Sequence, residues 1–136
     1  MNGNAQRVGR VVAIVGVLLG GYVHLRLYND GYRDIPNYAL GRSFLANVVA
    51  SGIVVVLLAL WRSPLALLAG IGISAGTLGA FVKSRTGAGI FGFAEHGLQP
   101  SPEAAIALFA ELAAGLICAA LLLQWLRRPA SRTVNG

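Results

Sequence analysis

The sequence is poor in the residues on which most catalytic and metal sites depend. Of its 136 residues only five are acidic, two are histidines and one, Cys118, is a cysteine. A single cysteine excludes an internal disulfide and paired-cysteine redox chemistry. The two histidines, His24 and His96, are too few to indicate a haem or metal site without further ligands. No nucleophile motif, zinc spacing or phosphate loop occurs, so we expect no catalytic residue, no metal and no cofactor.

Charge is scarce as well, at 12% of residues, whereas 56% are hydrophobic. The apolar residues gather in four runs, each close to the roughly 20 residues that cross a bilayer core, and the charges lie almost wholly between them. A soluble bundle would show a polar face along each helix. The sequence therefore predicts an all-α polytopic membrane protein, one up-down-up-down bundle of four transmembrane helices spanning residues 1–136. The predicted helices cover residues 9–27, 40–61, 64–83 and 102–126, and a short flexible tail covers 129–136.

Two of the predicted helices begin with a serine followed by a proline, Ser63-Pro64 and Ser101-Pro102. A serine hydroxyl caps free backbone N–H groups, and proline at the first helical position has no N–H to satisfy. We expect both serines to be helix caps.

Basic residues beside the helix ends favour an orientation with both termini in the cytoplasm. On the side of the termini lie six arginines: Arg7, Arg10, Arg62, Arg127, Arg128 and Arg132. On the other side lie five basic residues: Arg26, Arg33, Arg42, Lys83 and Arg85. The acids outside the spans fall on that second side: Asp30, Asp34, Glu95 and Glu103. Because the net charge of +6 is spread over helix ends, where it meets lipid head groups, we expect the lipid bilayer rather than a nucleic acid as partner.

One acid, Glu111, lies well inside the fourth apolar run. It follows Glu103 by eight residues, which is about 12 Å along a helix. An acid at such depth costs on the order of 2.5–3.5 kcal/mol to insert, and usually faces protein or a wet cavity. The residues at helical spacing around it are all small: Ala104, Ala107, Ala114, Gly115 and Cys118. We therefore predict that Glu111 faces the interior of the bundle.

Two further polar residues are the best candidate partners of Glu111: Asn47, predicted at a similar depth, and His24, predicted somewhat shallower. Thr77 can add a hydroxyl. Together Glu111, Asn47 and His24 form a predicted intramembrane polar site. Such groups can simply fix helix pairing, at about 0.6–2 kcal/mol per interhelical hydrogen bond, or they can form a working proton, ion or ligand site. The sequence leaves both interpretations open.

The third helix carries a stripe of small residues, Gly72, Gly76 and Gly79, which is typical of close helix packing in membranes. The partner helix can belong to the same chain or to a second copy in a homo-oligomer. The loop that follows, residues 84–101, is glycine-rich and contains Phe91 and Phe93, which can dip into the membrane interface. This loop is either a lid or a simple link.

Two segments, residues 41–47 (GRSFLAN) and 89–103 (GIFGFAEHGLQPSPE), resemble those of small, uncharacterised four-helix bacterial membrane proteins. The resemblance covers nearly the whole chain and implies a protein of the bacterial inner membrane. Because that group has no established activity, the resemblance assigns no catalytic residue.

Three functions remain open from the sequence. The first is a non-enzymatic accessory or structural component that packs with itself or in a larger membrane complex. The second is a small proton-coupled transporter or ligand-binding membrane protein that uses Glu111, assisted by Asn47 and His24. The third is a lipid or quinone binder that uses the phenylalanines of the long loop.

Overall fold

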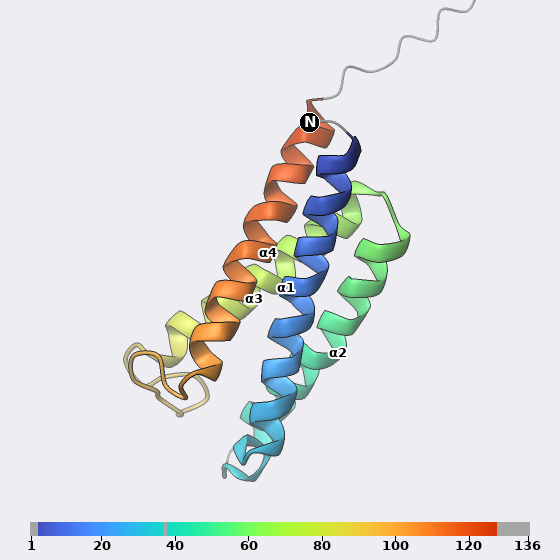
Figure 1. The fold of residues 1–136 in the computed structure, drawn as a ribbon. Helices are drawn as coiled ribbons and strands as arrows, with labels where there is room; N and C mark the ends of the chain where they lie inside the picture. Colours follow the sequence, from blue (N-terminus) through green and yellow to red (C-terminus); the bar gives the residue numbers. More distant parts are fainter. Residues whose placement is uncertain (1–2, 37, 128–136) are drawn as a thin grey trace, which may run out of the picture.

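Four long helices and one short 3-10 helix make up the computed structural model, which describes residues 3–36 and 38–127 (Figure 1). The elements are α1 (Gly3–Asn29), η1 (Tyr32–Asp34), α2 (Tyr38–Leu60), α3 (Pro64–Ser84) and α4 (Glu103–Leu126). The described part of the chain has no strand, and the predicted all-α four-helix fold is confirmed. The predicted flexible tail, 129–136, lies outside the described residues.

All four α-helices are long and apolar enough to cross a membrane. Large apolar side chains are exposed on each of them, for example Val15, Ile53, Leu68 and Phe109. Soluble monomers rarely expose apolar surface of this extent. The structure therefore indicates a multi-pass membrane protein.

The four helices alternate in direction. The start of α1, the link between α2 and α3, and the end of α4 lie at one end of the bundle, which we call the terminal end (Figure 1). Residues 30–36 and 85–102 lie at the opposite end, the loop end. Helix α1 packs against α2 and α4, and α4 packs against α3; α2 and α3 pack less closely than these pairs. Figure 1 shows α2 and α3 meeting at the terminal end and diverging toward the loop end.

The well-packed core lies in the terminal half, where small residues let the helices approach closely. Its buried members are Ala13, Val17, Val54, Leu58, Ala66, Leu67, Ala114, Cys118 and Leu121. Helix α3 meets α4 at Gly70, where an added Cβ would lie 2.7 Å from the Cys118 sulfur. Close approach of this kind is the main source of attraction between helices in lipid, because lipid tails remove the hydrophobic driving force between them.

The helix starts agree only in part with those predicted from the sequence. Ser63 caps α3 as predicted, because its hydroxyl accepts a hydrogen bond from the amide of Leu65 at 3.2 Å. The predicted cap at Ser101 is wrong, since α4 begins at Glu103 with no side-chain capping bond. There the carbonyl of Pro100 accepts from the amide of Ala104 at 2.8 Å instead.

Helix α1 begins at Gly3, earlier than the predicted start at residue 9. The prediction followed the apolar run, but the helix continues through polar residues beyond it. Near the predicted start, Arg10 ties α1 to the end of α2, because its guanidinium donates to the carbonyls of Leu58 and Trp61, each at 2.8 Å. Arginine in this position satisfies carbonyls that a helix C-terminus leaves free.

Candidate ligand cavity

Glu111 is fully buried, at 0% exposure, on the inward face of α4. Its Oε2 accepts a hydrogen bond from the Ser74 hydroxyl at 2.8 Å. Its Oε1 has no hydrogen-bond partner among the described residues. The carboxyl group fits against α1 only because Gly20 has no side chain, since a Cβ there would collide with Oε1.

The two partners predicted for Glu111 bond elsewhere. Asn47 donates to the Thr77 hydroxyl at 2.8 Å and accepts from Ser51 at 3.2 Å. The His24 ring bonds through Nδ1 to the carbonyl of Gly20 at 2.8 Å. The polar groups thus form two separate links between helices, Ser74 to Glu111 across α3 and α4, and Asn47 to Thr77 across α2 and α3.

Sequence reasoning missed Ser74 as the partner of Glu111. A lone serine in an apolar helix gives little signal, because it is also an ordinary packing residue. Its position was nevertheless informative: Ser74 precedes Thr77 by three residues, so the two lie close together on the surface of α3.

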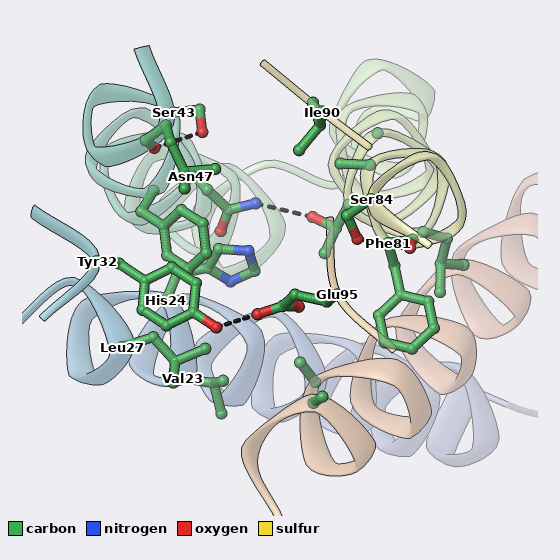
Figure 2. Close-up of a pocket in the computed structure, with 18 of the residues that line it drawn as sticks. Val23, His24, Leu27, Tyr32, Ser43, Asn47, Phe81, Ser84, Ile90 and Glu95 are labelled. Atoms are coloured by element: carbon green, nitrogen blue, oxygen red, sulfur yellow. Dashed lines mark hydrogen bonds between the residues drawn. The ribbon is translucent and has the colours of Figure 1, made fainter. Parts of the chain in front are cut away.

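Where α2 and α3 diverge, the loop half of the bundle contains a cavity of about 420 Å³. Asn47 and His24 line it, and Figure 2 shows their side chains in the same space between the helices. Glu111 is not part of its lining; the cavity reaches Ala107, one helical turn away on α4. The structure therefore brings two of the three predicted site residues to one cavity and leaves the third in the packed interior.

The outward side of the cavity is built from small residues. Gly72, Gly76, Ala46 and Ala80 line the cavity and are exposed. We call these four residues the lateral opening, because they face the surroundings of the bundle where α2 and α3 separate.

Among the described residues no helix packs closely against the glycine stripe, so the intrachain contact, one of its two possible roles, is not seen there. A Cβ added at Gly72, Gly76 or Gly79 would meet no atom within 4 Å. Helix α3 has small residues on two faces, and the packed face is the other one, which includes Gly70 and Ser74. Contact of the stripe with a second copy of the chain stays a prediction.

A polar triad lines the loop end of the cavity, which we call its mouth. The Tyr32 hydroxyl donates to Glu95 (Figure 2), and Glu95 pairs with Arg85 at 3.3 Å. Both charged side chains are largely buried, at 13% and 14% exposure. Burial, followed by the hydrogen bond to Glu95, raises the pKa of the Tyr32 hydroxyl well above its usual value.

Arg85 also fixes the long loop that forms the mouth. Its guanidinium donates to the carbonyls of Gln99 and Gly97, which lie late in the loop, and to the carbonyl of Phe81 on α3. The amide of Glu95 donates to the carbonyl of Ser84 at 2.9 Å. The loop between α3 and α4 is thus held against the end of α3.

Aromatic rings form one wall of the cavity. Tyr32 lies between Phe44 and Phe93, with ring centroids 4.8 and 5.7 Å away, and His24 lies 5.1 Å from Phe44. A tight turn carries Phe93 to this wall, with reciprocal backbone hydrogen bonds between Ile90 and Phe93 at 2.9 Å.

No protein-family model, curated protein or solved structure matches the chain. Within residues 3–36 and 38–127, no three His, Cys, Asp or Glu side chains group as a metal site would require. The cavity itself offers apolar surface, a few hydrogen-bonding side chains and a charge pair at the mouth.

Proposed function

We propose that this protein binds an amphipathic molecule of the bilayer, lipid-like or quinone-like, in the cavity between α2 and α3. The observation that carries the proposal is an apolar cavity of about 420 Å³ at membrane depth whose outward side consists of small residues. Ligand pockets commonly measure roughly 300–1,000 Å³ and are mostly apolar with a few polar groups. A cavity near the lower limit suits a single ring or a head group with part of one chain.

The lateral opening supports entry from the bilayer. Gly72 and Gly76 have open space where a side chain would lie, so a chain extending from the cavity can pass over them into the surrounding lipid. In the part of the chain that the structure describes, no helix packs closely against these glycines. Access to a ligand is an alternative reason for small residues at these positions.

The experiment blocks the lateral opening. Gly76→Leu adds a side chain in open space at the cavity, and Gly79→Leu adds the same side chain on the same helix outside the cavity lining. We expect native mass spectrometry in detergent, with 1-monooleoylglycerol and a benzoquinone bearing one isoprenoid unit as probes, to detect binding of at least one probe. Gly76→Leu should weaken that binding at least about tenfold, which is about 1.4 kcal/mol, and Gly79→Leu should leave it unchanged.

Circular dichroism of both variants confirms that they retain their helices. Equal binding by the native protein and both variants, or no binding of either probe by the native protein, contradicts the proposal.

A second candidate function, a structural component of the membrane, is favoured by the hydrogen bond between Ser74 and Glu111. This bond joins α3 and α4 in the buried interior, outside the cavity lining. If Glu111 serves to fix these helices, Ser74→Ala lowers the stability of the bundle by about 0.6–1.7 kcal/mol and leaves probe binding unchanged. Loss of probe binding at unchanged thermal stability would instead assign the pair to the ligand site. A proton-coupled function of Glu111 stays a prediction.

We further infer that the protein resides in a bacterial inner membrane with its terminal end in the cytoplasm. The resemblance described above supports the location. The arginines beside the terminal end support the orientation, as do the four acids outside the membrane spans, which all lie at the loop end. In this arrangement the cavity lies in the outer half of the bilayer.

A further inference from the structure

We infer that the ligand of this cavity carries an uncharged oxygen group, a carbonyl or a hydroxyl, bound within the hydrocarbon region by Asn47, Thr77 and His24. The inference rests on the proposed function and names the chemistry that its site recognises.

The three side chains lie far below the loop end. Asn47 follows the start of α2 by nine residues, about 13 Å along the helix, and Thr77 precedes the end of α3 by seven, about 10 Å. His24 precedes the end of α1 by five residues, about 8 Å. Where a polar group at this depth is shielded from water, bonding capacity that the protein leaves unused is costly.

Each of the three retains such capacity toward the cavity they line. Asn47 uses one amide N–H on Thr77 and keeps a second. Thr77 accepts that bond, so its hydroxyl hydrogen remains available to donate. A neutral His24 ring donates from Nδ1 to the Gly20 carbonyl, which leaves Nε2 as an acceptor. A ligand oxygen near these groups can accept from Asn47 and Thr77, and a hydroxyl can also donate to His24.

The charges around the cavity argue against an ionic head group. Among the described lining residues, the charged side chains are Arg85 and Glu95, and these are paired with each other at the mouth. A phosphate or carboxylate beside Asn47 would therefore lie in hydrocarbon without a counter-ion, where charge is expensive.

The aromatic wall favours a flat head group. His24, Phe44 and Tyr32 follow one another with centroid separations of 5.1 and 4.8 Å, within the range in which rings stack or meet edge to face. A benzoquinone ring offers both a flat face and two carbonyl acceptors. A monoacylglycerol offers hydroxyls without the ring, and the two share the uncharged oxygen chemistry.

The test compares three probes by native mass spectrometry: the benzoquinone with one isoprenoid unit, 1-monooleoylglycerol, and 1-oleoyl lysophosphatidate. We expect a neutral probe to bind, and Thr77→Val and Asn47→Leu each to weaken its binding by about tenfold, as expected for loss of one buried hydrogen bond. Thr86→Val is the matched control, because it makes the same change at a hydroxyl that lies outside the cavity lining and donates to the Lys83 carbonyl at 3.2 Å. The control should bind as the native protein does.

Either neutral probe binding more tightly supports the inference, and which one does so identifies the source as quinone or alcohol. The inference is overturned if lysophosphatidate binds as tightly as the neutral probes, or if binding that Gly76→Leu abolishes is unaffected by Thr77→Val. Because Thr77→Val preserves the shape of the side chain, its binding measurement can be interpreted even if the Asn47→Leu variant fails to fold. Binding that is insensitive to Gly76→Leu contradicts the proposed function itself. Failure of the proposed function can therefore be told apart from failure of the inference about the head group.

Discussion

At the scale of single residues, individual glycines differ in how closely a neighbouring helix approaches them. A Cβ at Gly16 would lie 2.8 Å from the Ala110 carbonyl oxygen and 2.9 Å from the Ala114 Cβ, and backbone cannot move aside easily. At Gly20 the obstacle is the carboxyl end of Glu111, a side chain that can rotate. At Gly72 there is no obstacle.

We predict a graded effect of alanine at these three glycines. Gly16→Ala should lower the free energy of unfolding by about 1–3 kcal/mol, the usual cost of overpacking, Gly20→Ala should lower it by less, and Gly72→Ala should change it little. Chemical unfolding in detergent micelles measures the series. A Gly72→Ala variant as unstable as Gly16→Ala would mean that the glycine stripe is packed after all.

A second residue-scale prediction concerns the ionisation of Tyr32. Its pKa is raised in the folded protein, first by burial and then by the hydrogen bond to Glu95. The stability that this shift contributes is therefore fully present below the ordinary tyrosine pKa of about 10, and is lost as pH rises through the higher folded value.

Spectrophotometric titration of tyrosinate absorbance tests this shift. The native protein should show a component that ionises well above pH ~10, and Tyr32→Phe should remove that component while leaving the others. Superimposable titration curves would show that Tyr32 ionises like an exposed tyrosine, and would contradict its burial against Glu95.

At the scale of elements, the long apolar runs predict the helices well, because spanning a bilayer leaves few alternatives to a helix. Which face of a helix is packed is harder to predict. Helix α3 carries small residues on both sides, and the sequence does not tell that the face with Gly70 and Ser74 is the packed one. The helix caps are hard to predict for a similar reason. Ser63 and Ser101 are each followed by proline, but at the start of α4 the Pro100 carbonyl accepts the hydrogen bond of a free backbone amide.

The loop between α3 and α4 provides a prediction at this scale. Because Arg85 holds the loop through Glu95 and the carbonyls of Gly97 and Gln99, Arg85→Gln should accelerate hydrogen exchange of loop amides by about tenfold, the effect of losing roughly 1.4 kcal/mol of local stability. Arg33→Gln is the control, since Arg33 pairs with Asp34 only at the exposed surface. Equal exchange in both variants would show that Arg85 does not order the loop.

At the scale of the whole molecule, the sequence predicts the depth of the polar residues but not their grouping. Asn47 and His24 share a cavity because α2 and α3 diverge, and Glu111 is excluded from it because α1 and α4 pack tightly at Gly16 and Gly20. Crossing angles follow from packing along the full length of the helices, which a hydropathy pattern does not specify.

Orientation is also a property of the whole molecule, and cysteine labelling tests it. In a Cys118→Ala background, Arg62→Cys at the terminal end should be protected from a membrane-impermeant maleimide in intact cells, and Asp34→Cys at the loop end should react. The reverse pattern would place the cavity in the cytoplasmic half of the membrane.

The central claim, that a bilayer molecule occupies the cavity between α2 and α3, is tested most directly by photo-cross-linking in reconstituted vesicles. The neutral probe that binds in native mass spectrometry, given a photoactivatable chain, is irradiated, and the labelled residues are mapped by mass spectrometry. We predict labelling concentrated on the cavity-lining parts of α2 and α3, around Asn47 and Thr77, and its loss in Gly76→Leu but not in Gly79→Leu. Labelling spread evenly over the exposed faces of all four helices, and unchanged by Gly76→Leu, would contradict the claim.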